Sequence, residues 1–127
     1  MTYKTYGTAT KEKCPSEAVE MSSFFNKLRS TYPELGRIAL HIRNEGLRTH
    51  QQVQKMRLDG GFVPGASDVV IPGAPSFVME MKSRAKTAKV SKEQVAYLEA
   101  CAAQGAFTCV ALGAVAAWQA LEDWRAL

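Results

Sequence analysis

The 127-residue sequence lacks any run of about 18 apolar residues, the length that a membrane-spanning helix requires. It contains no CxxC pair, and its two histidines, His41 and His50, stand apart. Its three cysteines, Cys14, Cys101 and Cys109, are odd in number and widely spaced. These absences argue against a membrane protein, a zinc site and a disulfide framework, and we interpret each cysteine as a small buried hydrophobe.

The N-terminal stretch MTYKTYGTATKEKC is polar and has no apolar segment of the kind found in a secretory signal peptide. We therefore expect a protein that is not secreted and that stays in a reducing cytoplasm. Residues 1–13 are predicted to form a flexible arm, and residues 14–127 a single domain, because the chain is short for two domains.

Positive charge is in excess and clustered, with a net charge of +4 and a pI near 9.1. One group is Lys82, Arg84, Lys86, Lys89 and Lys92, and a second is Arg37, Arg43, Arg48, Lys55 and Arg57. Such clusters attract phosphate backbones without reading base sequence. A solubilising surface carries the same charges, so charge alone leaves both interpretations open.

Hydrophobic periodicity and turn signals predict eight elements. Helices are expected over residues 15–30, 50–58, 91–104 and 114–127, and strands over residues 38–42, 67–71, 77–82 and 107–112. Two of the helices begin with the capping-box pattern, Thr49-x-x-Gln52 and Ser91-x-x-Gln94. This mixture predicts an α/β fold with a small central sheet flanked by helices on both faces.

Three charges lie in the two strand-like runs around the turn Pro72-Gly73-Ala74-Pro75. If the hairpin is symmetric about Ala74, Asp68 lies opposite Glu80, with Cβ atoms about 4.5–5.5 Å apart, and Lys82 is the diagonal neighbour. Two carboxylates at that distance repel one another, and a divalent cation would resolve the repulsion. The alternative is that these are strand-end charges that reach solvent.

Four short motifs occur in order along the chain: RNEG at 43–46, GFVPGASD at 61–68, MEMK at 79–82 and SKEQ at 91–94. In this order and spacing they resemble the VRR-NUC domain, a replication and repair nuclease domain of the PD-(D/E)xK superfamily. The resemblance covers roughly residues 16–122 and is closest to minimal standalone members from phages and bacteria. It implies a restriction-endonuclease-like core and an origin in a bacterium or a phage-infected cell.

The resemblance also implies an activity, namely Mg²⁺- or Mn²⁺-dependent hydrolysis of phosphodiester bonds in DNA. Carried over by position, Asp68 and Glu80 would bind the metal, Lys82 would be the catalytic lysine, and Gln94 matches the glutamine that follows the lysine motif. A glutamate on the first helix completes the acidic cluster in these proteins.

Two residues compete for that last role. The apolar stripe of the first helix consists of Met21, Phe24, Phe25 and Leu28. At about 100° per residue, Glu17 falls roughly 30° from the centre of this stripe and Glu20 roughly 90° away. Glu17 is therefore our first choice and Glu20 the second, although Met21 stands where such proteins often have a glutamine.

Gln94 also has two interpretations. As the fourth residue of a capping box, its side chain would bind the backbone amide of Ser91. As an active-site residue it would face the substrate, and we expect the two roles to exclude each other in any one conformer. The residues expected to grip DNA are Arg84, Lys86, Lys89, Lys92, Arg43 and Arg48.

The form of the DNA and the assembly are expectations from the resemblance. Branched, Holliday-junction-like DNA needs two paired cuts and hence a homodimer, which is expected to use the final helix with Trp118 and Trp124, or the edge of the first strand. The same tryptophans could instead pack in the core. A flap- or nick-type repair nuclease and an inactive nucleic-acid-binding module are the alternative functions. We interpret His41 as a core or structural histidine.

Overall fold

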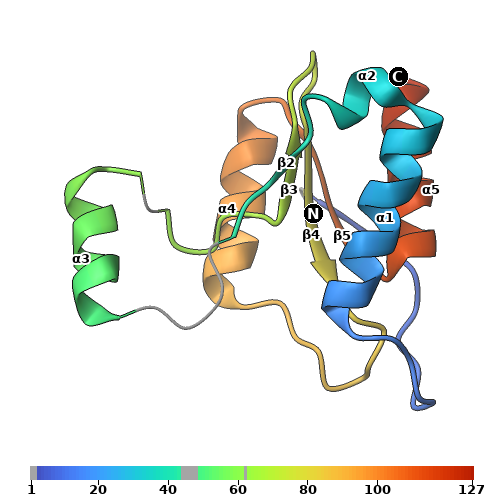
Figure 1. Ribbon diagram of the computed structural model, residues 1–127, viewed down its shortest axis with the longest axis horizontal. Coiled ribbons are helices and arrows are strands. Elements are labelled where there is room, and N and C mark those ends of the chain that lie inside the picture. The colour runs from blue at the N-terminus through green and yellow to red at the C-terminus, as the bar shows by residue number, and fades with distance from the viewer. Residues whose placement is uncertain (1–2, 44–48, 62) are drawn as a thin grey trace.

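The computed structural model describes residues 3–43, 49–61 and 63–127, which form a mixed sheet with helices on both faces (Figure 1). The strands are β1 (Lys4–Tyr6), β2 (Leu40–His41), β3 (Val69–Ile71), β4 (Phe77–Lys82) and β5 (Phe107–Leu112). The helices are α1 (Glu17–Thr31), α2 (Pro33–Gly36), α3 (His50–Leu58), α4 (Lys92–Ala103) and α5 (Ala114–Arg125).

The sheet order is β1-β5-β4-β3-β2. Strand β5 runs parallel to both β1 and β4, whereas β3 runs antiparallel to β4 and β2. In Figure 1, α1 and α5 lie on one side of this sheet and α4 on the other. The predicted α/β class, a small mixed sheet covered on both faces, is confirmed.

The side chains on the two faces of β4 pack into two separate hydrophobic cores, because side chains alternate along a strand. Met79 and Met81 belong to the larger core with α1 and α5, whereas Val78 packs with Leu98 of α4. All four side chains are at most 3% exposed. A strand that is apolar on both faces is what a sheet covered on both sides requires.

Helix α1 forms where the sequence predicted it, with a slightly later start. Ser16 is the N-cap and its hydroxyl accepts the Val19 N–H at 3.2 Å, so the helix begins at Glu17. The predicted stripe is buried against the sheet: Met21, Phe24, Phe25 and Leu28. The helix ends before Pro33, which opens the short α2 that the sequence analysis did not predict.

The prediction of a flexible arm over residues 1–13 is wrong for the residues that form β1. Lys4 pairs with Cys109 of β5, and the Tyr6 hydroxyl donates to Asp123 at 2.7 Å. Thr10 forms an isolated bridge with Ala85. A three-residue polar strand carries no periodic signal, and its partner lies at the other end of the chain, so local sequence could not reveal it. The single domain over residues 14–127 stays a prediction.

Helix α3 stands apart from the sheet in Figure 1, and none of its residues is buried. The polar composition explains this, because the helix has no apolar stripe wide enough to bury. Among the described residues, no helix has the length and apolarity that crossing a bilayer would take.

Candidate active site

The hairpin of β3 and β4 has the register that symmetry about Ala74 predicted. Val69 pairs with Met79, Val70 with Val78, and Ile71 with Phe77. Asp68 precedes Val69 and Glu80 follows Met79, so the same register places Asp68 opposite Glu80, one residue beyond the last paired residues. The two carboxylates therefore lie on one face of the hairpin, at the end away from the turn.

Both carboxylates are inside the protein, which excludes the interpretation as strand-end charges in solvent. Asp68 is 6% exposed and Glu80 is 0% exposed. Asp68 Oδ2 accepts the Met81 backbone N–H at 3.0 Å, and Lys82 Nζ lies 3.7 Å from Glu80 Oε2. Burying a charge is costly unless it is paired and hydrogen-bonded, and these contacts offset part of the cost.

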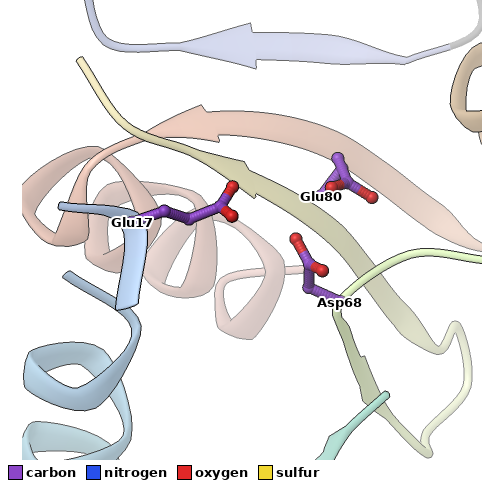
Figure 2. Close-up of side chains that lie close together, drawn as sticks. All are labelled: Glu17, Asp68 and Glu80. Atoms are coloured by element: carbon purple, nitrogen blue, oxygen red, sulfur yellow. The ribbon is translucent and has the colours of Figure 1, made fainter. Parts of the chain in front are cut away.

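Glu17 is the third carboxylate (Figure 2). It opens α1, is half-buried, and points toward the space between Asp68 and Glu80. Glu20 lies elsewhere, 3.5 Å from Arg84 Nε and against Gly113. The choice of Glu17 over Glu20 from helix phase thus agrees with the geometry, although the role of Glu17 stays a prediction.

The cluster has the dimensions and chemistry of a site for a hard divalent cation. One oxygen from each of Glu17, Asp68 and Glu80 lies within 4.8 Å of the other two. Mg²⁺ holds oxygen ligands at about 2.0–2.1 Å, so ligands on opposite sides of the ion are about 4.2 Å apart. The three oxygens would need to move inward only slightly to reach this ligand-to-ligand distance. A donor set made only of carboxylates suits Mg²⁺ or Mn²⁺.

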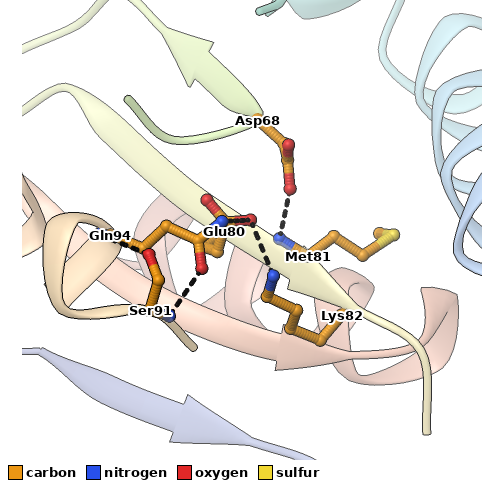
Figure 3. Close-up of polar contacts among 6 residues, drawn as sticks. All are labelled: Asp68, Glu80, Met81, Lys82, Ser91 and Gln94. Carbon is orange, nitrogen blue, oxygen red and sulfur yellow. Dashed lines mark hydrogen bonds and ion pairs between the residues drawn. The ribbon is translucent and has the colours of Figure 1, made fainter. Parts of the chain in front are cut away.

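Gln94 closes the capping box of α4 and also contacts the acidic cluster (Figure 3). Its Oε1 accepts the Ser91 backbone N–H at 2.9 Å, and the Ser91 hydroxyl accepts the Gln94 N–H at 3.1 Å, which completes the capping box. Its Nε2 donates to Glu80 Oε2 at 3.2 Å. Both contacts are possible because a carboxamide has an acceptor end and a donor end, so capping does not keep Gln94 away from Glu80. Its role in the active site stays a prediction.

Gly65 fixes the loop before Asp68 against the first turn of α4. It has φ of +76°, and a Cβ there would run into the Glu93 backbone and come within 2.7 Å of the Gln94 nitrogen. Only glycine tolerates both the left-handed backbone and this close approach. The loop that carries Asp68 and the helix that carries Gln94 are therefore set against each other by backbone contact.

Two hollows meet at Glu17. One of about 490 Å³ is lined by Cys14, Glu17, Lys82 and Lys89 among others. The other, about 320 Å³, is lined by Glu17, Asp68, His41 and Arg43 among others. The acidic cluster thus has a hollow with basic side chains on either side.

Of the residues expected to grip DNA, Lys89 and Arg43 line these hollows. Lys86, Lys89 and Lys92 are exposed in the segment between β4 and α4 or at its end. Arg84 is exposed but pairs with Glu20, and Arg48 lies outside the described residues.

His41 was not among the predicted site residues. It is exposed rather than a core residue, stacks on Phe25 with ring centroids 5.6 Å apart, and lines the hollow that contains Asp68. Its position on the edge strand β2 follows from the pairing with Val69, which no local pattern encodes.

The remaining cysteines and tryptophans pack. Cys109 is buried, and that burial raises the pKa of its thiol well above the usual range, which keeps it unreactive. Cys101 packs beside Leu98 but is only half-buried, as is Cys14, so the prediction of a buried cysteine is correct for Cys109 and wrong for the other two. Trp118 stacks on Tyr32, and Trp124 packs against Phe77 and donates to the Pro75 carbonyl at 2.8 Å.

Comparison with known proteins gives one informative result. No family model matches the sequence, and no curated protein matches it either. The structure is similar to a solved structure described as a VRR_NUC domain protein, with a TM-score of 0.73 and 18% sequence identity. The match covers 91% of this chain and 93% of the other. The chain has the fold of a VRR-NUC domain.

The VRR-NUC fold confirms, at the level of architecture, the resemblance seen in the four sequence motifs. It also accounts for the placement of the acidic cluster, since a mixed sheet with α1 beside it is what brings Glu17 to the hairpin.

Proposed function

We propose that this protein is a divalent-metal-dependent DNA endonuclease that hydrolyses phosphodiester bonds in branched, Holliday-junction-like DNA. The observation that carries the proposal is the convergence of Glu17, Asp68 and Glu80, with Lys82 Nζ 3.7 Å from Glu80, in a VRR-NUC fold. Carboxylates and a lysine at one end of a hairpin are the groups that metal-assisted phosphoryl chemistry requires.

Glu17, Asp68 and Glu80 would hold the cation. A bound Mg²⁺ or Mn²⁺ would supply Lewis-acid chemistry, polarising a phosphate oxygen and making a water molecule more acidic. In the reaction the water oxygen forms a bond to phosphorus and the bond from phosphorus to the leaving sugar oxygen breaks. The proton that the water loses goes to solvent, and solvent protonates the leaving oxygen.

Lys82 would contribute a positive charge beside Glu80. Its side chain is 13% exposed, so the ammonium is held close to the carboxylates in a largely desolvated setting. There it would orient the attacking water or offset the negative charge that develops on the phosphate oxygens. Gln94 would act through Glu80, which it contacts directly.

The two hollows that share Glu17 support a path for the nucleic-acid strand. A phosphate over the acidic cluster would have Lys82 and Lys89 on one side and Arg43 on the other. Phosphate contacts of this kind release counterions, so DNA affinity should fall steeply as salt rises.

The test is cleavage of a panel of DNA forms with Mg²⁺ or Mn²⁺: a four-way junction, a flap, a nicked duplex and a linear duplex. Asp68→Asn and Glu80→Gln should abolish cleavage while leaving the fold intact. Glu20→Gln is the matched control, because Glu20 is a glutamate in the first turn of α1, as Glu17 is, but lies outside the cluster.

Each result of this panel decides something. Equal cleavage by Asp68→Asn and the wild type would refute the site. Preference for the flap or the nicked duplex would assign the repair-nuclease alternative, and binding without any metal-dependent cleavage would assign the inactive binding module.

Paired cutting of a junction requires a homodimer. Since Trp124 is engaged with Pro75 and Trp118 with Tyr32, the edge of β2 is the better surface for a second copy. Leu40 of β2 is 51% exposed and Ile38, in the turn before the strand, is 45% exposed. Among the described residues, β2 pairs on one side only. Light scattering of the wild type and of Leu40→Lys tests this: a wild-type monomer at micromolar concentration would contradict it.

A further inference from the structure

We propose that the capping box of α4 is a positioning device for the metal-binding carboxylate, in which Ser91 acts through Gln94 on Glu80. This inference rests on the proposed function, because it concerns how the cation-binding cluster is held. It adds a residue, Ser91, that never touches the cluster itself.

The first step is the orientation of the Gln94 carboxamide. Its oxygen faces the Ser91 N–H, which donates, and its nitrogen faces Glu80 Oε2, which accepts (Figure 3). Rotating the amide by 180° would set its NH₂ group against the N–H donor and its oxygen against the carboxylate. Both contacts would become repulsive, so the helix cap allows one amide orientation only.

The second step is the effect on Glu80. Gln94 Nε2 and Lys82 Nζ approach the same oxygen, Oε2, at 3.2 and 3.7 Å. Two donors from two elements, α4 and β4, hold Oε2 in place and so restrict the rotation of the carboxylate. Partners of metal-ligating carboxylates that fix their orientation typically change metal affinity about 10–100-fold when removed.

The third step is the anchoring of the box. The Ser91 hydroxyl accepts the Gln94 N–H, which ties residue 94 to the start of the helix. Gly65 presses the loop before Asp68 against the backbone at Glu93 and Gln94. The first turn of α4 therefore helps to position both carboxylates. It contacts Glu80 through the Gln94 amide, and it contacts the loop that carries Asp68 through Gly65.

The chain contains its own control. Thr49 and Gln52 at the start of α3 form a capping box with the same two distances, 2.9 and 3.1 Å. In the described part of the chain, the side chains of Thr49 and Gln52 bond each other's backbone amides and contact none of the three clustered carboxylates, and α3 has no buried residue. Thr49→Ala therefore removes the same kind of cap away from the cluster.

The experiment measures Mn²⁺ affinity of the full chain by calorimetry, without DNA. Ser91→Ala should weaken Mn²⁺ binding by about threefold to tenfold, a part of the effect expected for losing the Gln94 contact itself. Ser91→Thr, which keeps a capping hydroxyl, should restore the wild-type affinity, and Thr49→Ala should not change it. In a Gln94→Ala background, Ser91→Ala should have no further effect.

A second readout does not depend on the metal. The side-chain NH₂ protons of Gln94 should exchange slowly with solvent in NMR spectra, and Glu80→Gln should shift their resonances. Ser91→Ala should speed their exchange, with the side chain of Gln52 as internal reference.

Either of two results would overturn the inference: equal effects of Ser91→Ala and Thr49→Ala on Mn²⁺ affinity, or a full effect of Ser91→Ala in the Gln94→Ala background. If the wild type binds no Mn²⁺, the proposed function fails instead. In that case the NH₂ exchange rates still decide whether Ser91 orients Gln94, and unchanged exchange in Ser91→Ala would refute it.

Discussion

Helices α3 and α4 both begin with a capping box but differ in what the helix contacts. Both open with a hydroxyl residue followed three positions later by glutamine, and both capping boxes have the same geometry. Helix α3 buries none of its residues, whereas α4 buries Leu98 completely and lies against the sheet. Of the two capping glutamines, both within the described residues, Gln94 of α4 contacts a carboxylate of the acidic cluster and Gln52 of α3 does not.

The comparison shows that a capping box specifies where a helix starts but not what its glutamine does beyond the cap. In α4 the amide nitrogen meets Glu80 because packing carries the helix to β4.

The largest difference is expected between Lys82 and Lys55. Lys82→Met removes the ammonium beside Glu80 and should lower the cleavage rate about 10²–10³-fold, the loss typical of removing one group that stabilises developing charge. Lys55→Met on α3 should leave the cleavage rate at saturating DNA unchanged and lower the slope of affinity against salt by about 1 at most. Single-turnover cleavage measures both, and equal losses in the two variants would contradict a specific role for the charge beside Glu80.

The second prediction compares Gly65 with Gly60. Both have positive φ, +76° and +73°, but a Cβ at Gly65 meets the backbone of α4 and a Cβ at Gly60 meets nothing within 4 Å. Gly60→Ala should cost only the left-handed backbone strain, about 1–2 kcal/mol. Gly65→Ala should cost more, about 3 kcal/mol or above, because the backbone must also move.

Urea unfolding measures the free energy of both variants. If Gly60→Ala is as destabilising as Gly65→Ala, the contact between the Asp68 loop and α4 is not what constrains Gly65.

The third prediction concerns the caps. Ser91→Ala should lower the free energy of global unfolding by about 1 kcal/mol. Thr49→Ala should leave global unfolding unchanged and speed amide exchange within α3, since an unpacked helix opens locally. Hydrogen exchange followed residue by residue separates the two. A global loss of the same size in Thr49→Ala would mean that α3 is part of the cooperative core.

The smallest prediction is a pH effect on the packed face of α4. Burial first, and then a hydrogen bond to Cys101, raises the pKa of Tyr97 above its usual value. The unfolded chain then loses the tyrosine proton at lower pH than the folded protein does. Stability from this group is full below pH about 10 and is lost as pH rises through the folded pKa.

Tyr97→Phe removes this linkage, so its free energy of unfolding should fall less steeply above that pH than the wild-type value. Parallel curves for the two proteins would contradict the assignment to Tyr97.

Much of the site could be predicted from sequence because its decisive signals are local. The symmetric hairpin set Asp68 opposite Glu80, and helix phase selected Glu17 over Glu20. Both capping boxes were visible as Ser/Thr-x-x-Gln. These patterns depend on residues at most twelve positions apart, which the sequence displays directly.

What could not be predicted depends on contacts between distant segments. β1 pairs with β5 across most of the chain, and no pattern in Lys4–Tyr6 signals it. The contact of Gln94 with Glu80 was missed because local sequence shows the cap but not the approach of Glu80. The position of His41 beside the cluster likewise follows from sheet order rather than from its neighbours.

The most direct test of the central claim, that Glu17, Asp68 and Glu80 form one cation site, is a calorimetric titration with Mn²⁺. The wild type and Glu20→Gln should bind with the same affinity, and Glu17→Gln should bind at least about tenfold more weakly. Equal binding by Glu17→Gln and Glu20→Gln, or no binding by the wild type, would contradict the claim.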